Sequence, residues 1–157
     1  MVVAPDPGWP ARFEIERARI APLLPGAEIH HIGSTAVPGL PAKPIIDVMA
    51  LVDDMDAAVP ALIERGGYRY PEATNAMLTD RRFLCRPSPA ARTHHLHLAD
   101  DRAVLDRHLR FRDALRADAA LAAAYGELKL RLAERHRRDR EAYTDAKTKF
   151  IDAVARA

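Results

Sequence analysis

The sequence predicts one α+β domain over residues 1–157, in which a mixed β-sheet carries flanking helices and a three-helix C-terminal half. Short apolar runs bounded by Gly and Pro lie between residues 28 and 99, and such runs are typical of buried strands. After Asp100 the pattern becomes helical throughout. Strands followed by helices are typical of the α+β class, and 157 residues suffice for one well-cored domain but are few for two.

The first half of the chain is expected to form two helices and two strands. Apolar residues recur at helical spacing after Pro10, and Pro25-Gly26 would end that helix. A run of aspartates after the second strand can cap the next helix, which would end at Gly66-Gly67. The expected elements are a helix over 11–24, strands over 28–32 and 45–52, and a helix that is capped by Asp53, Asp54 or Asp56 and ends at Gly66-Gly67.

The second half is expected to complete the sheet and then to form the helical end. Short runs predict strands at 68–70, 82–86 and 93–99, and the connection at 71–80 is expected to be a mobile loop. Breaks near 117–118 and 136–139 divide the remainder into helices over about 101–117, 119–136 and 139–156.

Composition is that of a globular protein and favours a cytoplasmic location. Hydrophobic residues make up 48% and charged residues 29%, which excludes extensive disorder. A lone cysteine, Cys85, cannot form an internal disulfide and fits a reducing compartment. The first residues lack the basic and apolar regions of a signal peptide. No run approaches the roughly 20 apolar residues of a membrane span, so we expect no membrane partner.

The two halves of the chain carry opposite charge. Residues 1–75 hold 6 Lys and Arg against 10 Asp and Glu, whereas residues 76–157 hold 18 against 12. The basic half can hold a phosphate-bearing ligand against the other half, although arginine-rich helices also carry such charge on solvated faces. Nucleic acid is a disfavoured partner because aromatic residues are few and basic residues are spread over helices. No pattern indicates an oligomeric state.

A single carboxylate, Asp47, interrupts the apolar run at 45–52. Burying a lone carboxylate costs on the order of several kcal/mol, so Asp47 requires a partner. The Gly33-Ser34 turn before it lets backbone N–H groups and a hydroxyl approach a phosphate. A carboxylate beside such a turn can hold a divalent cation that bridges to the phosphate, and Mg²⁺ is the expected ion. The loop offers further donors at Ser34, Thr35 and Lys43.

This spacing resembles the nucleotidyltransferase superfamily of the DNA polymerase beta type. In that superfamily a Gly-Ser or Gly-Gly turn precedes a strand with two acidic residues separated by one. Gly33-Ser34 and Asp47 match that pattern, but Met49 stands in the place of the second carboxylate. Two-metal transfer needs several anionic ligands, so Asp47 as catalytic residue and metal ligand requires help from other side chains.

A longer stretch resembles the GrpB family, a group described as predicted nucleotidyltransferases. H-I-G-S-T-A-V-P-G-L-P-A-K-P-I-I-D (31–47) is similar to the family signature. The resemblance implies a nucleotidyltransferase-like fold. Because similar domains occur fused to dephospho-coenzyme A kinase, it also implies a role in nucleotide or coenzyme A metabolism. The likeness continues in D-P-G-W-P (6–10), R-R-F (81–83), T-H-H-L-H-L (93–98), H-L-R-F-R-D-A-L-R (108–116), Y-G-E-L-K (125–129) and R-E-A-Y-T-D-A-K-T-K-F-I (140–151).

Strand alternation places two histidines of the run T-H-H-L-H-L on one face. His95 and His97 share that face, and the intervening leucines share the other, which should be the core side. Two imidazoles at this spacing can share a metal ion or contact a phosphate, or they can be half-exposed on a solvated face. The family resemblance favours a site role for them. If the sheet brings this strand beside Asp47, they can replace the missing carboxylates, as metal ligands or as phosphate donors. His31, before the Gly-Ser turn, is a further candidate.

Further candidates for ligand binding lie on the helical half and at the start of one strand. A tyrosine beside a cation on one helix face offers stacking for a base and charge for its phosphate. The same spacing is also common on ordinary amphipathic helices. The candidates are Arg82, which otherwise forms a surface ion pair, Arg112, Tyr125 with Lys129, and Tyr143 with Lys147.

Together these features predict a nucleotidyltransferase-fold protein that binds a nucleotide or another phosphorylated small molecule in a basic cleft. Transfer of a nucleotidyl group with Mg²⁺ would use Asp47, and Met49 argues against it. One alternative is a non-catalytic ligand- or partner-binding module that has lost the second acidic metal ligand. Another is a small metal-dependent hydrolase built on His95 and His97.

Overall fold

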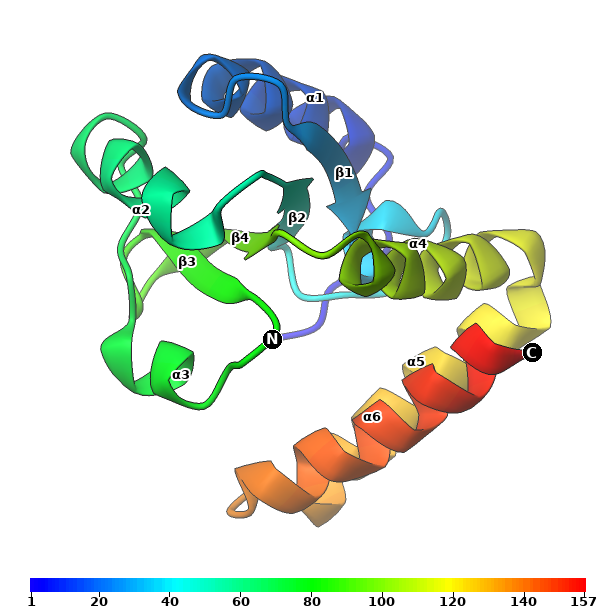
Figure 1. Cartoon of the computed structure of the whole chain (residues 1–157). Helices are drawn as coiled ribbons and strands as arrows, with labels where there is room; N and C mark the ends of the chain where they lie inside the picture. The colour runs from blue at the N-terminus through cyan, green and yellow to red at the C-terminus, as the bar shows by residue number, and fades with distance from the viewer.

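The structure, a computed structural model, describes residues 1–157 and every side chain except that of Arg140. Within it a four-stranded mixed sheet has the strand order β1-β2-β4-β3 (Figure 1). Strand β2 pairs antiparallel with β1 and parallel with β4, and β3 pairs antiparallel with β4. The predicted α+β class is confirmed. The strands are β1 (Glu28–Ile32), β2 (Ile46–Leu51), β3 (Arg82–Pro87) and β4 (Arg92–Ala99).

Helices cover the sheet and form most of the second half of the chain. They are α1 (Trp9–Ile20), α2 (Met55–Glu64), α3 (Glu72–Ala76), α4 (Arg102–Ala117), α5 (Ala119–Arg135) and α6 (Arg140–Arg156), with single 3₁₀ turns η1 (Ala21–Leu23) and η2 (Ser34–Ala36). Aspartates accept hydrogen bonds from the first-turn N–H groups of α2, α4, α5 and α6, as expected of N-caps. Among the described residues, none of the helices has both the length and the hydrophobicity required to span a bilayer.

One face of the sheet forms the main core against α1 and α2. Phe13 and Ile20 of α1 and Leu62 of α2 pack there on the apolar side chains of β2, β3 and β4. Glu16 of α1 lies in the same layer with no exposure. The core residues that the strands contribute to this face are Ile46, Val48, Ala50, Leu84, Leu96 and Leu98.

Glu16 is a buried charge whose oxygens are fully engaged. It accepts hydrogen bonds from Tyr68 Oη at 2.5 Å, Arg86 Nη2 at 2.6 Å and Arg19 Nη2 at 2.7 Å. Burial raises the pKa of Glu16, but these donors outweigh it and hold that pKa at about 2. The carboxylate therefore joins α1 to β3 beneath the sheet.

The opposite face of the sheet is only partly covered. Helix α4 packs Leu105 against Ile32, Met49 and Ala99 at one end of that face. Helices α5 and α6 run side by side beyond α4 as a hairpin that extends away from the sheet (Figure 1). The turn between α4 and α5 at Asp118 therefore sets the direction of the hairpin, and with it which of its side chains face the sheet.

Two sequence expectations between residues 68 and 80 are wrong. The predicted strand at 68–70 is reduced to an isolated bridge between Arg69 and Cys85. The predicted mobile loop at 71–80 contains α3, whose Asn75 is 6% exposed. Its side-chain amide donates to the carbonyl of Phe83 and accepts from the Phe83 N–H. Asn75 thus pairs the outer edge of β3 as a neighbouring strand would, because buried backbone groups require partners.

Candidate functional site

The uncovered face of the sheet carries Asp47, His95 and His97 side by side. In the register of β2 and β4, Asp47 lies opposite His95, and Met49 lies opposite His97. His95 Nδ1 is 2.9 Å and His97 Nε2 is 3.8 Å from Asp47 Oδ1. Their side chains are 17–24% exposed. The predicted pairing of the two histidines on the face opposite the core is confirmed, and we refer to these three residues as the Asp47 cluster.

Hydrogen bonding in the Asp47 cluster stabilises the carboxylate but leaves part of each imidazole unsatisfied. Burial raises the pKa of Asp47, whereas the contacts with His95 and His97 outweigh it and hold that pKa below its usual range. Burial lowers the pKa of His97, partly opposed by Asp47. Nε2 of His95 and Nδ1 of His97 are buried with no hydrogen-bond partner among the described residues. The polar network of this cluster is therefore incomplete.

Gly33 brings the loop after β1 directly against Asp47. Its backbone has φ +75° and ψ −175°, a conformation that essentially only glycine adopts. A Cβ at this position would lie 2.6 Å from Asp47 Oδ2 and 2.9 Å from Asp47 Cβ. Glycine is required here for two independent reasons, and Ser34 is thereby placed beside the Asp47 cluster.

Met49 occupies a fully buried position, 0% exposed, on the same face of β2 as Asp47. It packs with Ile32, Ala99 and Leu105 beneath α4. A carboxylate in its place would have His30 and His97 as cross-strand neighbours but would be fully buried against these apolar side chains, which is costly without a cation. The position of the second acidic residue is therefore buried and largely apolar on its α4 side.

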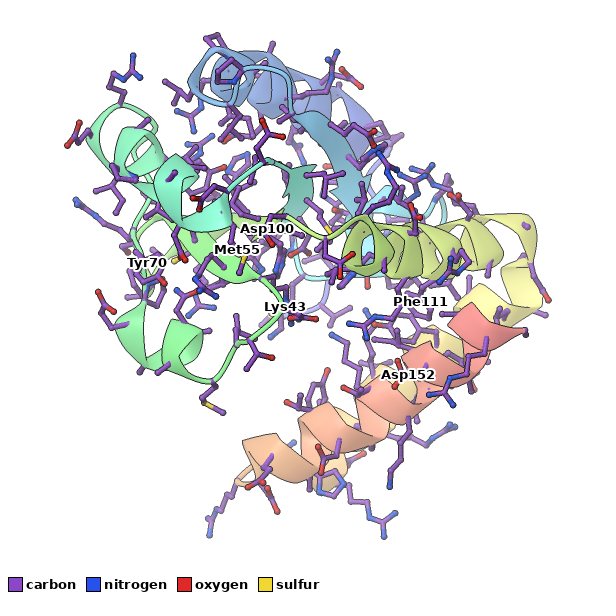
Figure 2. All side chains as sticks on the ribbon, in the orientation of Figure 1. Lys43, Met55, Tyr70, Asp100, Phe111 and Asp152 are labelled. Carbon is purple, nitrogen blue, oxygen red and sulfur yellow. The ribbon has the colours of Figure 1, made fainter. Side chains whose placement is uncertain are left out.

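Lysines from α5, α6 and the loop at 43 face the Asp47 cluster. Lys129 Nζ donates a hydrogen bond to Ser34 Oγ and lies 4.9 Å from the centroid of the Tyr125 ring. Burial, Lys147 and Lys43 lower the pKa of Lys129 to about 8, and Asp47 opposes this. Burial lowers the pKa of Lys147 as well, again opposed by Asp47. Lys43 is exposed and lies between the sheet and the α5–α6 hairpin (Figure 2).

The two tyrosines of the predicted Tyr/Lys pairs differ in accessibility. Tyr125 is 4% exposed and is enclosed by Phe111 and Phe150, with ring centroids 5.1 and 5.6 Å away. It fixes the hairpin against α4 and has no ring surface for a base, so the expected stacking role is wrong for Tyr125. Tyr143 is half-buried on α6 and remains a candidate, with its pKa raised by burial.

Arg82 does not join the Asp47 cluster. It lies opposite Leu98, on the core side of β3. Its guanidinium forms a bidentate ion pair with Asp56, at 2.7 and 3.3 Å. The preceding Arg81 lies just before β3 and forms an ion pair with Asp80 at 3.0 Å. Its charge lowers the pKa values of both His97 and Lys147, which places it near the cluster, and its Nε is buried without a hydrogen-bond partner. Sequence reasoning missed Arg81, although its alternation with Phe83 was a usable signal.

His31 and Thr35 hold the loop rather than face the cleft. His31 is opposite Val48 in the register, on the core side, and stacks on Phe13 with centroids 4.8 Å apart. Thr35 Oγ1 donates to the Ile45 carbonyl, so His31 Nε2, 2.9 Å from that hydroxyl, must carry the proton and donate to it. The expected ligand-binding role of both residues is not supported by these contacts.

Arg112 also has an anchoring position. Its Nη1 donates to the carbonyl of His31 at 3.1 Å, and its Nε donates to Asp113 at 2.8 Å. Arg116, one turn later, donates to the carbonyl of Ala36. The guanidinium of Arg112 therefore attaches α4 to β1 and is not directed at the Asp47 cluster.

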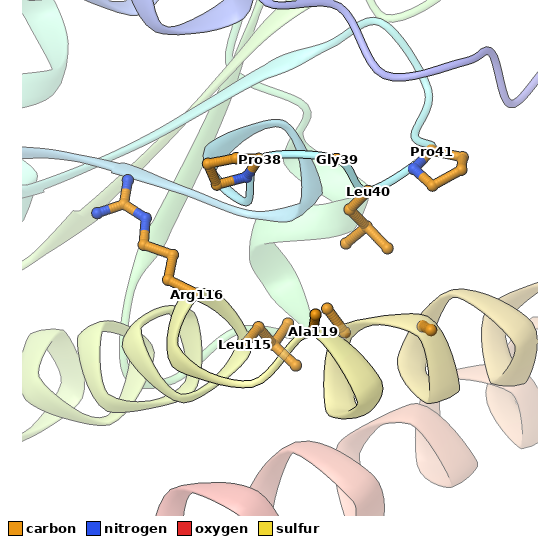
Figure 3. Close-up of a pocket in the computed structure, with 9 residues that line it drawn as sticks. Pro38, Gly39, Leu40, Pro41, Leu115, Arg116 and Ala119 are labelled. Carbon is orange, nitrogen blue, oxygen red and sulfur yellow. The ribbon is translucent and has the colours of Figure 1, made fainter.

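A separate hollow lies elsewhere on the molecule. A groove of about 540 Å³ separates the loop at 38–41 from the junction of α4 and α5 (Figure 3). Its lining is mostly apolar, and its charged member, Arg116, is already bonded to the Ala36 carbonyl. Phosphate recognition requires available donors, so the Asp47 cluster and its lysines, rather than this groove, form the candidate site.

Comparison with known proteins gives a family and a fold. The family described as GrpB protein matches residues 1–157. A UPF0157 protein of Pseudomonas aeruginosa is 43% identical over 98% of this chain, which spans 65% of that relative's length. A dephospho-CoA kinase of Mycolicibacterium paratuberculosis is 31% identical over 99% of this chain, which covers 45% of the kinase.

Solved structures agree with this assignment. A crystal structure of conserved protein GrpB from Enterococcus faecalis has a TM-score of 0.82 at 36% identity, over 99% of this chain and 95% of that one. The Cid1 poly(U) polymerase with MgGTP bound has a TM-score of 0.54 at 18% identity, over 85% of this chain and 45% of the polymerase. At that identity the likeness shows the fold alone, which is nucleotidyltransferase-like.

Proposed function

The chain belongs to the GrpB family, and from that premise we propose that it binds a nucleotide or another phosphorylated small molecule. The binding site would lie between the Asp47 cluster and the lysines of α5 and α6. The observation that carries the proposal is an excess of positive charge at this place: Lys43, Lys129 and Lys147 face a single carboxylate, Asp47, in the described structure.

Repulsion among these lysines supports an anionic ligand. Lys129 and Lys147 are each partly desolvated, and both have lowered pKa values because burial and neighbouring cations disfavour their charged forms. A phosphate group between them would offset that repulsion and accept charge-assisted hydrogen bonds. Ser34 adds a hydroxyl, and Gly33 leaves the approach from the loop free of a side chain.

The donor set at Asp47 does not fit the two-ion Mg²⁺ chemistry of nucleotidyl transfer. Mg²⁺ prefers oxygen ligands in an octahedral arrangement, whereas the cluster supplies one carboxylate and two imidazoles. Met49 fills the remaining position with an apolar side chain. We therefore propose binding as the function, and this substitution favours the second candidate, a non-catalytic module, over transfer. Release of pyrophosphate from nucleoside triphosphates is not expected.

A titration with a matched control tests the proposal. Thermal unfolding would be followed with each nucleoside triphosphate and with dephospho-coenzyme A at millimolar concentration. We expect at least one ligand to raise the melting temperature, and Lys129→Met to weaken its binding about tenfold or more, as for the loss of a charged hydrogen bond. Lys149→Met, an exposed position on α6, is the control. Flat melting curves for every ligand, or equal losses in both variants, would refute the proposal.

A further inference from the structure

We propose that Asp47, His95 and His97 together hold one divalent transition-metal ion, with zinc the expected ion, in place of Mg²⁺. This inference concerns the same site as the proposed function and rests on it for the role of the ion, which would be to bind a phosphate oxygen. The geometry of the three side chains and the chemistry of their donor atoms support it independently.

The ligand atoms are already close to the separations of a shared metal ion. One oxygen or nitrogen of each residue lies within 4.8 Å of those of the other two. Ligands at about 2.1 Å from one ion are about 3.0 to 3.4 Å apart in octahedral or tetrahedral geometry. Asp47 Oδ1 is 2.9 Å from His95 Nδ1 and 3.8 Å from His97 Nε2. Side-chain rotations that bring the imidazole nitrogens closer together, by up to about 1.4 Å, would complete the site.

The nature of the donors selects the ion. Neutral imidazole is a ligand for zinc and other first-row transition metals, while Mg²⁺ is held mainly by carboxylates, phosphates and water. Two histidines and one carboxylate leave at least one coordination position open, as in zinc sites that bind a substrate or water.

The surrounding charge sets a condition on this binding. Lys129 and Lys147 repel a bare cation near Asp47, and a phosphate between the ion and the lysines removes that repulsion. Binding of metal and of phosphate should therefore strengthen each other by the same factor, because such coupling is reciprocal. Metal affinity is consequently expected to rise when inorganic phosphate is present.

Cobalt titration of the full chain tests the site without any activity assay. The protein would carry no histidine tag and would be freed of metal with a chelator. Co²⁺ binding would be followed by the visible absorption of the ion, both without phosphate and with about 1 mM inorganic phosphate. We expect one Co²⁺ per chain, displaced by equimolar Zn²⁺ but not by about a hundredfold excess of Mg²⁺.

Variants assign the ligands. His95→Ala and His97→Ala should each weaken Co²⁺ binding at least tenfold, and Asp47→Asn, which keeps the shape of the side chain, should do the same. His136→Ala at the turn between α5 and α6 should not change it. Circular dichroism of the metal-free variants shows that they are folded. Absence of stoichiometric Co²⁺ and Zn²⁺ binding, displacement by equimolar Mg²⁺, or undiminished binding in all three cluster variants overturns the inference.

The outcome is separable from that of the proposed function. If nucleotides bind and Lys129→Met weakens them while no transition metal binds, the metal inference fails and the phosphate site stands. If one Co²⁺ binds through His95 and His97 but no phosphorylated ligand affects the protein, the phosphate site fails and the metal site stands.

Discussion

Gly33 and Asp47 are in such close contact that any side chain at position 33 would overlap the Asp47 carboxylate. A Cβ at position 33 would lie 2.6 Å from Asp47 Oδ2, and the glycine has a φ of +75°. The carboxylate therefore fits into space that exists because residue 33 has no side chain. The Gly-Ser turn and the acidic strand, which the sequence presents as separate features, form one unit.

Replacing Gly33 by alanine should both destabilise the fold and displace Asp47. The positive φ costs about 1 kcal/mol or more for alanine, and the overlap with Asp47 adds about 1 to 3 kcal/mol. Gly39→Ala is the matched control, since Gly39 has φ +77° with nothing within 4 Å of its Cβ position. Urea unfolding should show a larger loss for Gly33→Ala; equal losses would contradict the close contact.

Binding of a triphosphate should weaken above about pH 8. Burial, Lys147 and Lys43 lower the pKa of Lys129 to about 8 and Asp47 opposes them, so the ammonium group is present below this pH and is lost above it. Affinity, measured by calorimetry from pH 6 to pH 9.5, should be level at first and then decline. Lys129→Arg keeps its charge and should reduce the decline, whereas Lys149→Arg should leave it unchanged. An identical decline in Lys129→Arg would exclude Lys129 as its cause.

The buried network at Glu16 should make stability sensitive to acid. The folded-state pKa of about 2 lies below the ordinary value of 4.5, so the contribution is fully present above pH 4.5 and is lost as pH falls toward 2. Glu16→Gln should lower the free energy of unfolding by about 3 kcal/mol at pH 7. The difference from the unmodified chain should shrink below pH 4.

An exposed pair on the same helix provides the comparison for Glu16. Glu14 contacts Arg17 with both side chains about half exposed, and such pairs contribute about 0 to 1 kcal/mol. Glu14→Gln should therefore have little effect on urea unfolding at any pH. A loss as large as that of Glu16→Gln would show that burial of the network is not the cause.

The hydroxyl of Thr35 should matter for the loop and not for the ligand. Thr35→Val leaves His31 Nε2 buried without an acceptor and should cost about 1 to 3 kcal/mol in the free energy of unfolding. Thr35→Ser restores the hydroxyl and should restore most of that stability. Nucleotide affinity of the folded Thr35→Val variant should equal that of the unmodified chain; a tenfold loss in Thr35→Val that Thr35→Ser reverses would instead indicate direct contact of the hydroxyl with the ligand.

Much of this fold was accessible from the sequence because its signals are local. Alternation in β4 placed His95 and His97 together on one face, and the register of β2 and β4 brings them to Asp47. Breaks at Asp118 and Asp139 separated the last three helices because aspartate caps them. The prediction of a strand at 68–70 is wrong. Whether three residues form a strand depends on how many hydrogen bonds the neighbouring strand edge can make with them, and here they form one bridge.

The errors at the site have a common physical origin: they depend on strand pairing and on packing between residues that are far apart in the sequence. Arg81 and Arg82 are adjacent, and the pairing of β3 with β4 puts Arg82 opposite Leu98 on the core side, away from Asp47. Burial of Tyr125 depends on Phe111 and Phe150, on two other helices. The contact of Lys129 with Ser34 spans 95 residues of sequence and is set by how the α5–α6 hairpin packs.

The central claim is that a phosphate group binds between Lys129, Lys147 and the Asp47 cluster. Calorimetry should compare one nucleoside triphosphate with its parent nucleoside, on the unmodified chain and on Lys129→Met/Lys147→Met. We predict that the triphosphate binds at least a hundredfold more tightly than the nucleoside, and that the double variant loses this preference. Equal affinity for nucleoside and triphosphate, or a preference retained in the double variant, would contradict the claim.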